Sequence, residues 1–208
     1  MTYRLHCFAE SGNAYKAALM LALADADWEP VLVDFFAGGT RTPEYLALNP
    51  MGEAPVLEVE GGPTLSQSGV ILDYVACAEG RFGWESEEER REILRWLLFD
   101  NHKLTSYTAT LRFLRTFAGH GEGEVTAFLE ARATAALGVL ERHLETREFV
   151  LGDRPTIADL SLAGYLFWPD EIGIAIEERR AIAAWLARIR ALPGWRHPYD
   201  LMPGHPRP

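Results

Sequence analysis

Three groups of residues in the first third of the chain carry side-chain or backbone groups that could bind a small anionic ligand. Gln67 and Ser68 stand where a helix is expected to begin, and the exposed N–H groups and dipole of a helix N-terminus favour an anion. Ala54 precedes Pro55, which is expected to open a strand and to leave the N–H and C=O of Ala54 free to pair with an extended chain. Ser11 occupies a turn before another expected helix, where its hydroxyl can face the same place. These features predict a backbone segment that can pair with an extended ligand, next to a binding site for a carboxylate. Such a site suits a short peptide with a free acidic end.

The residues around these groups are expected to alternate between strands and helices. Strands are expected over residues 3–8, 28–35 and 56–59, followed by a tight turn at 61–63 and a second short strand. Helices are expected over residues 14–26, over a short stretch from Thr42, and from about 67 to 77. This order predicts a βαβ unit joined to a ββα unit in an α+β domain spanning residues 1–78, and it resembles the thioredoxin fold.

Everything after a linker at residues 78–84 is expected to be helical, so a second, all-α domain is predicted over residues 86–208. Helices are expected from Ser86 through an apolar pattern that reaches residue 114, over 125–144, from Thr156, and over 178–191. Thr156 and Asp159 have the spacing of a capping box, so Asp159 is interpreted as structural rather than catalytic. The tail from Arg196 contains four prolines and is expected to be extended and exposed.

Composition narrows the classes of partner. The chain has 208 residues and a formal net charge of −10, which argues against a nucleic acid or an anionic membrane surface. No stretch approaches the ~20 apolar residues of a membrane span, and the N-terminus lacks the apolar core of a signal peptide. Cys7 and Cys77 have no metal-ligand spacing and form no disulfide framework. A reducing cytoplasm and a site without metal are therefore expected.

Two segments resemble a known family. Residues 49–68 are similar to the glutathione-binding half of the cytosolic glutathione transferases, with Pro55 at the position of a cis-proline and Gln67-Ser68 at the pair that opens the next helix. Residues 149–159 resemble the capping-box segment of the family's helical domain. The resemblance covers nearly the whole chain. It implies the glutathione-transferase fold, which is a thioredoxin-like N-terminal domain followed by an all-α C-terminal domain, and a cis Ala54–Pro55 bond.

The resemblance also implies how a thiol would be activated. Ser11, with the Asn13 amide beside it, would stabilise the glutathione thiolate, although Ser11 equally fits a plain helix cap. A free thiol has a pKa of ~8.5, and one hydrogen bond together with a helix N-terminus could lower it by roughly 2 units. Neither position 11 nor Ala14 is a cysteine, so a Cys-x-x-Cys disulfide reductase mechanism is excluded.

The remaining glutathione contacts follow from the same resemblance. Gln67 and Ser68 would hold the γ-glutamyl end, while Ala54 and Pro55 would dock the cysteinyl part through the backbone. Arg41 would take the glycyl carboxylate by a forked contact, or would be an ordinary solvated surface arginine.

The second substrate is expected to be a hydrophobic electrophile. The side chains predicted to line its pocket, or alternatively to pack in the core, are Tyr15, Phe99, Leu104, Tyr107 and Leu111. We therefore expect a cytoplasmic, homodimeric transferase of the detoxification type that joins the glutathione thiolate to an electrophile. A non-catalytic glutathione-binding module, or a glutathione-dependent peroxidase or isomerase, remains an alternative because the same fold can carry different functions.

Overall fold

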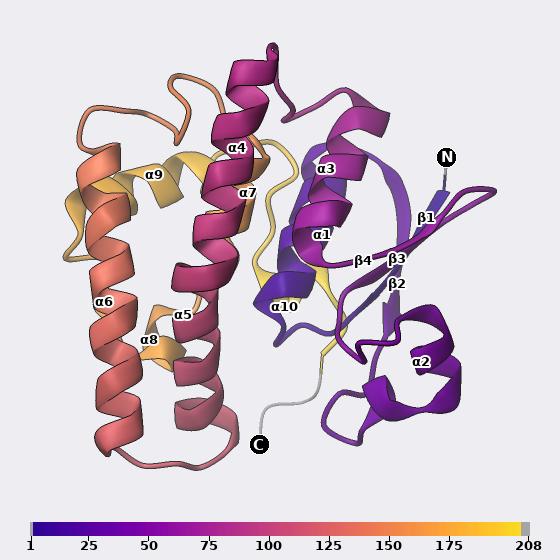
Figure 1. The fold of residues 1–208 in the computed structure, drawn as a ribbon, viewed down its shortest axis with the longest axis horizontal. Helices are drawn as coiled ribbons and strands as arrows, with labels where there is room; N and C mark the ends of the chain where they lie inside the picture. The colour runs from indigo at the N-terminus through magenta and orange to yellow at the C-terminus, as the bar shows by residue number, and fades with distance from the viewer. Residues whose placement is uncertain (1, 205–208) are drawn as a thin grey trace. The chain divides into compact units, whose positions relative to one another are not determined.

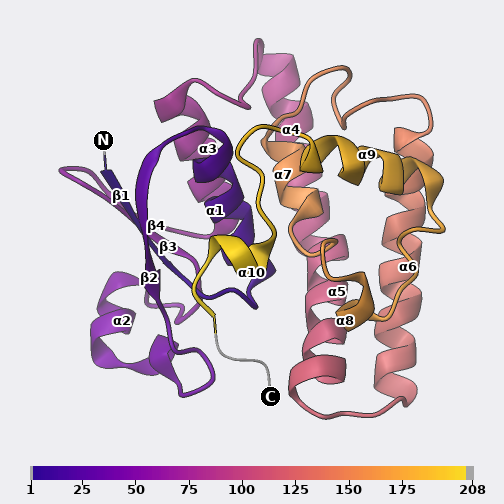
Figure 2. The same cartoon turned by 180° about the vertical axis from the view of Figure 1, so that it is seen from behind.

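The computed structural model describes residues 2–204, which fold into two units (Figures 1 and 2). Unit 1 contains the chain up to Gly83 together with the segment from Leu192 onward, and unit 2 contains Trp84–Ala191. We expected the second domain to continue from residue 86 to the end of the chain. The contacts instead group the last segment with unit 1, so that unit is built from both ends of the sequence.

Unit 1 is a four-stranded mixed sheet with helices packed on it. The strands are β1 (Thr2–Cys7), β2 (Asp27–Leu32), β3 (Val56–Val59) and β4 (Thr64–Ser66), and their order across the sheet is β2-β1-β3-β4. β1 pairs in parallel with β2 and antiparallel with β3, which in turn pairs antiparallel with β4. The helices are α1 (Gly12–Leu23), the 3₁₀ turn η1 (Gly39–Arg41), α2 (Pro43–Leu48) and α3 (Ser68–Glu79). This arrangement confirms the predicted thioredoxin-like layout.

The alternation of buried and more exposed side chains along β1 decides which face of the sheet α1 and α3 cover. Tyr3, Leu5 and Cys7 point to one face and are fully buried, and α1 and α3 lie side by side over that face (Figure 1). The Tyr3 hydroxyl donates a hydrogen bond of 2.5 Å to Glu79 at the end of α3. Burial raises the pKa of the Cys7 thiol to about 12, so this cysteine is a packing residue and not a nucleophile.

The described part of the C-terminal segment, up to Gly204, contains a helix, contrary to the expectation of an extended, exposed tail from Arg196; residues 205–208 of that tail lie outside the described residues. The described part forms the short helix α10 (Pro198–Leu201), which packs against α1 (Figure 2). The His197 side chain caps this helix by accepting a hydrogen bond from the Tyr199 N–H. Pro198, Leu201 and Met202 are buried, because a short apolar run at the end of the chain finds a surface on unit 1 to cover.

Unit 2 is built on a long helical run from residue 87 to residue 117. It consists of α4 (Glu87–Phe99), the π-helical segment η2 (Asp100–Leu104), α5 (Thr105–Arg112) and a second π-helical segment, η3 (Phe113–Phe117). Ser86 caps α4 as expected, by accepting a hydrogen bond from the Glu89 N–H. The π-helical turns were not predicted; the wider turn brings residues five apart together, as in the 2.8 Å bond from Thr105 Oγ1 to the buried Asp100 carboxylate.

The other helices of unit 2 pack on this run. They are α6 (Glu124–Leu144), the fully buried α7 (Ile157–Ala163), the short α8 (Pro169–Ile172) and α9 (Arg180–Arg190). Asp159 at the start of α7 is fully buried and accepts hydrogen bonds from the N–H groups of Thr156 and Val150, from the Thr156 hydroxyl and from the Trp185 indole. The capping box at Thr156 is therefore confirmed, and it also ties α7 to α9.

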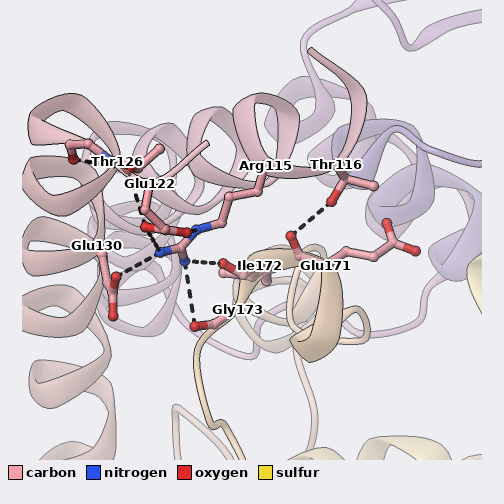
Figure 3. Close-up of polar contacts among 9 residues, drawn as sticks. Arg115, Thr116, Glu122, Thr126, Glu130, Glu171, Ile172 and Gly173 are labelled. Atoms are coloured by element: carbon pink, nitrogen blue, oxygen red, sulfur yellow. Dashed lines mark hydrogen bonds and ion pairs between the residues drawn. The ribbon is translucent and has the colours of Figure 1, made fainter. Parts of the chain in front are cut away.

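Arg115 joins three parts of unit 2 (Figure 3). Its guanidinium donates to Glu122 in the loop after η3, to Glu130 on α6 and to the carbonyl of Ile172 at the end of α8, at distances of 2.9, 2.8 and 2.7 Å. The hydrogen bond to Glu122 raises the pKa of Arg115, and the same contact lowers the pKa of Glu122. This cluster fixes the end of the hairpin that the long helical run forms with α6.

Within residues 2–204 no helix is both long and apolar enough to cross a membrane.

Candidate functional site

The first component of the site is the turn that leads from β1 into α1. Ser11 is 7% exposed, and its hydroxyl oxygen accepts a hydrogen bond of 3.1 Å from the Ala14 N–H, so it is the N-cap of α1. A hydroxyl has two acceptor lone pairs and one donor. Capping uses an acceptor and leaves the O–H able to donate elsewhere. The two roles considered for Ser11 are therefore compatible in one geometry.

A contact between Asn13 and Ser68 joins the N-termini of α1 and α3. The Ser68 hydroxyl lies 3.5 Å from the Asn13 Oδ1, which is a long and weak hydrogen bond. Both side chains are partly exposed. The first N–H groups of each helix have no partner within the helix, so two positive helix ends converge at this point. An anion could replace the weak contact at little cost.

The loop before β3 supplies a free piece of backbone. The Ala54–Pro55 bond is cis, as the family resemblance implied. The carbonyl of the preceding Glu53 accepts bonds from the Tyr45 hydroxyl (3.0 Å) and the Asn49 amide (2.8 Å), which fix the loop. The β1–β3 pairing begins at Val56, and among residues 2–204 neither the N–H nor the C=O of Ala54 has a hydrogen-bond partner. Ala54 thus offers one donor and one acceptor for an extended ligand.

Gln67 connects this loop to α3. Its side-chain amide donates to the Glu53 carboxylate at 3.0 Å and lies 3.2 Å from the Met51 sulfur. Its backbone has a φ of 69°, a left-handed value that is strained for a residue other than glycine and that is concentrated at functional sites. Ser11, Asn13, Ala54, Gln67 and Ser68 are therefore brought together within unit 1, and we refer to them as the polar corner.

Arg41 lies beside the same loop. It is exposed, and its guanidinium packs against Gly52, so closely that a Cβ on that glycine would lie 2.6 Å from the Arg41 nitrogen. Gly52 has a φ of +63°, which also favours glycine. Within the described part of the chain Arg41 forms no ion pair, which agrees with either of its two predicted roles.

The residues predicted to line an electrophile pocket are placed differently from one another. Tyr15 is fully buried in unit 1, and its hydroxyl donates to the Arg196 carbonyl at 2.9 Å, so its polar group is already used. Leu104 and Leu111 are buried in the core of unit 2, because they lie on the inner side of the long helical run. These three are core residues rather than accessible pocket residues. Phe99 and Tyr107 are partly exposed, and the Tyr107 hydroxyl accepts bonds of 3.3 Å from Arg132.

An aromatic cluster beside the polar corner was missed. The ring of Phe8, at the end of β1, stacks on Phe35 with centroids 4.8 Å apart, and Phe36 meets both rings edge-on. Phe35 and Phe36 remain 37% and 46% exposed. The Phe8 carbonyl accepts the Ser11 N–H at 3.0 Å, so the cluster begins next to the serine turn. The signal in the sequence was two consecutive phenylalanines at the end of a strand, where only one could face the core.

No group of three or more histidine, cysteine, aspartate or glutamate side chains among residues 2–204 is arranged to hold a metal ion. The polar corner instead combines hydroxyl and amide groups, two helix N-termini and an unpaired backbone segment. These groups can bind a small anionic peptide and stabilise a negative charge near Ser11.

Comparison with known proteins agrees with this geometry. Residues 1–77 match the family described as "Glutathione S-transferase, N-terminal domain", and residues 102–193 match "Glutathione S-transferase, C-terminal domain". The chain is 29% identical to maleylacetoacetate isomerase of Pseudomonas aeruginosa over 210 residues, covering 98% of this chain and 92% of that protein.

Solved structures give the same result. A possible glutathione S-transferase from Rhodopseudomonas palustris shares 34% identity and a TM-score of 0.88, covering 94% of this chain and 97% of that one. A Burkholderia graminis glutathione transferase, crystallised with two glutathione molecules per subunit, shares 27% identity and a TM-score of 0.83, covering 93% of this chain and 85% of that one. Two domain matches in the family's order, on a fold shared over almost the whole length, show that the chain belongs to the glutathione S-transferase family.

Proposed function

We propose that this protein binds glutathione at the polar corner and transfers its thiolate to a hydrophobic electrophile. The observation that carries the proposal is the chain of contacts that unites the polar corner. Asn13 meets Ser68, and the neighbouring Gln67 holds Glu53, which directly precedes Ala54. Residues from three separate segments are thus linked by contacts, which supports a single binding place for an extended tripeptide.

Each part of glutathione has a matching group. The two helix N-termini and the Ser68 hydroxyl would receive the γ-glutamyl carboxylate, with Gln67 beside it. The free N–H and C=O of Ala54 would pair with the cysteinyl residue as an added strand pairs with a sheet edge. Arg41, next to Gly52, would attract the glycyl carboxylate. Because the net charge of the chain is −10, these local groups must supply the attraction for an anionic peptide.

Ser11 would donate its free O–H to the sulfur. The N-terminus of α1 adds positive potential, and together these could lower the thiol pKa by roughly 2 units, which is about 2.7 kcal/mol in favour of the thiolate. The thiolate then forms a C–S bond with the electrophilic carbon, and the leaving group departs with its electron pair. The exposed rings of Phe35 and Phe36 would hold an apolar electrophile beside the sulfur.

The test is Ser11→Ala, with Ser86→Ala as a matched control. Both serines cap a helix by accepting a bond of 3.1 Å from the N–H three residues on, so both variants lose a cap of the same kind. Ser11→Ala should reduce turnover at neutral pH by ~10–100-fold, because the pKa of the bound thiol should rise by roughly one to two units. Its affinity for glutathione should stay nearly constant, and Ser86→Ala should retain wild-type turnover. Equal turnover in both variants would remove Ser11 from the chemistry and leave Asn13 as the candidate.

A glutathione-dependent isomerase is a second candidate, and one observation favours it. The relative named maleylacetoacetate isomerase aligns over 98% of this chain. An isomerase would use the same thiolate. The thiolate would add to one carbon of a cis double bond, the remaining C–C single bond would rotate, and the thiolate would then leave so that the double bond forms again as trans. The two activities differ in glutathione consumption. Conjugation consumes one glutathione per product, whereas isomerisation leaves its concentration unchanged.

We also propose a cytoplasmic homodimer with a role in detoxification. Leu94 and Leu98 lie four residues apart on α4, so they share one face of the helix, and they are 53% and 61% exposed. Such an apolar face supports contact with a second copy of the chain. Cys7 and Cys77 are both free thiols, which is consistent with a reducing compartment.

A further inference from the structure

The C-terminal segment Leu192–Gly204, which we call the strap, runs along α1 from its end back to its start (Figure 2). At Gly194 the strap touches the last turn of α1, where a Cβ would lie 2.8 Å from the Ala22 carbonyl oxygen. The Arg196 carbonyl then accepts the Tyr15 hydroxyl at 2.9 Å. The strap is therefore fixed at successive points along the helix that begins at Ser11.

The last fixed point lies immediately before Ser11. The Ala9 N–H donates to the Pro203 carbonyl at 2.7 Å, the shorter end of the range for such bonds. Gly204 follows, and it approaches so closely that a Cβ there would lie 2.6 Å from the Ala9 Cβ. A side chain does not fit between the strap and the turn without displacing one of them.

The turn also has supports of its own, in the Ser11 cap and in the Phe8 ring, which stacks on Phe35. Its internal bond runs from the Ser11 N–H to the Phe8 carbonyl at 3.0 Å, and β1 ends at Cys7. Pro203 therefore holds the turn from outside, at the residue two positions before the serine. Donors to a developing charge must be held within roughly 0.5 Å of the productive position, and a 1 Å displacement can cost ~100-fold in rate.

We propose that the strap is a positioning element for the thiolate, with the Pro203 carbonyl as the group that sets the place of Ser11. This rests on the proposed function of the polar corner. Among the described residues, the strap forms no hydrogen bond or ion pair with Ser68 or Arg41, which would bind the two ends of glutathione. Its loss should therefore disturb thiol ionisation much more than glutathione affinity.

Two variants test the proposal. Gly204→Ala places a methyl group against Ala9 and should push the end of the strap away from the turn, while Gly121→Ala, at a glycine with open space around it, is its control. A chain ending after Met202 removes the Pro203 carbonyl. A chain ending after Gly204 keeps that carbonyl and is the control for shortening.

Three measurements are made on each protein. Ultraviolet absorbance of the thiolate against pH gives the thiol pKa of bound glutathione, calorimetry gives the dissociation constant, and hydrogen exchange on the free protein gives protection of the amides of residues 9–14. In both test variants the thiol pKa should rise by about one unit, and kcat/KM at neutral pH should fall by ~5–10-fold because the thiolate fraction falls. Affinity should change by less than about twofold. Activity should approach that of the wild type at alkaline pH, where the thiol ionises unaided.

Different results separate the possible failures. An unchanged thiol pKa and unchanged amide exchange in both variants would overturn the proposal and leave the strap as packing only. A lower melting temperature with a wild-type pH profile would do the same. If the wild-type protein itself does not lower the glutathione pKa, the proposed function fails. Amide exchange at Ala9–Ala14 would still decide whether the strap holds the turn.

Discussion

Replacing Asp159 by alanine should destabilise unit 2 strongly without a direct effect on chemistry. The carboxylate is fully buried and accepts four hydrogen bonds, three of them from the Val150 N–H, the Thr156 N–H and the Trp185 indole N–H, at 2.8, 2.8 and 2.9 Å. Burial raises the pKa of Asp159, while these donors lower it by favouring the ionised form. In Asp159→Ala the three donors remain buried and lose their acceptor.

The size of the effect follows from those donors. Leaving a buried donor unsatisfied costs about 1–3 kcal/mol, so three of them give at least roughly 3 kcal/mol. The capping box adds no further contribution, because its bond from the Thr156 N–H to Asp159 is already one of the three. We expect a decrease of about 3–5 kcal/mol in the free energy of unfolding, which is a large part of the ~5–15 kcal/mol that stabilises a typical protein.

Urea unfolding followed by circular dichroism and by tryptophan fluorescence measures this quantity. Asp153→Ala is the control, because Asp153 is an exposed aspartate in the same segment. The fraction of Asp159→Ala that stays folded should have wild-type turnover per active site. A loss below about 1 kcal/mol would refute the interpretation of the carboxylate as a buried acceptor. Full stability with lost turnover would move Asp159 into the active site.

Three further outcomes are expected. Burial lowers the pKa of His143 from its ordinary value of 6.5, so its contribution to stability is complete above pH 6.5 and is lost as the pH falls below that value. Urea midpoints measured as the pH is lowered should therefore fall more for the wild type than for His143→Gln. Parallel curves for the two proteins would contradict this. Phe36→Ala should raise the KM for an aromatic electrophile by ~5–10-fold, because it removes about 1 kcal/mol of ring contact, and should leave the KM for glutathione unchanged. Equal changes in the two KM values would exclude an electrophile site at Phe36. Leu98→Glu should halve the molecular mass measured by light scattering, while the control Val125→Glu, at an exposed valine on α6, should leave it unchanged. An unchanged mass for Leu98→Glu would exclude this face of α4 as the dimer contact.

The hairpin and the capped helices could be predicted because their signals are local. Gly61 and Gly62 with Pro63 punctuate two short apolar strands, and the structure has a turn there, with the Gly62 N–H bonded to the Val59 carbonyl at 2.9 Å. Ser86 and Thr156 cap helices because a hydroxyl at that place satisfies an N–H three or two residues ahead. Turns and helix caps depend on a few neighbouring residues and can therefore be predicted from the sequence.

The features that escaped prediction depend on distant parts of the chain. Nothing near Pro198 indicates that it will pack on α1, more than 170 residues earlier in the chain, so the tail from Arg196 was expected to be extended and exposed. The π-helical turn at Asp100 leaves the periodicity of the sequence almost unchanged, and its cause includes the bond of 2.5 Å from Ser161 on α7 to the Asp100 carboxylate. Tyr15 has the character of a pocket residue, and only the position of Arg196 shows that its hydroxyl is occupied.

Unit 1 is built from two segments that are separated in the sequence by Trp84–Ala191, and this has a consequence for synthesis. During translation Trp84–Ala191 leaves the ribosome as one uninterrupted stretch and can fold as soon as it has emerged. The β1–α1 turn is made before Trp84–Ala191, whereas its outer support at Pro203 is made after that stretch. The turn at Ser11 therefore lacks this support until Pro203 has been made, and a polypeptide that stops before Pro203 carries the serine without it.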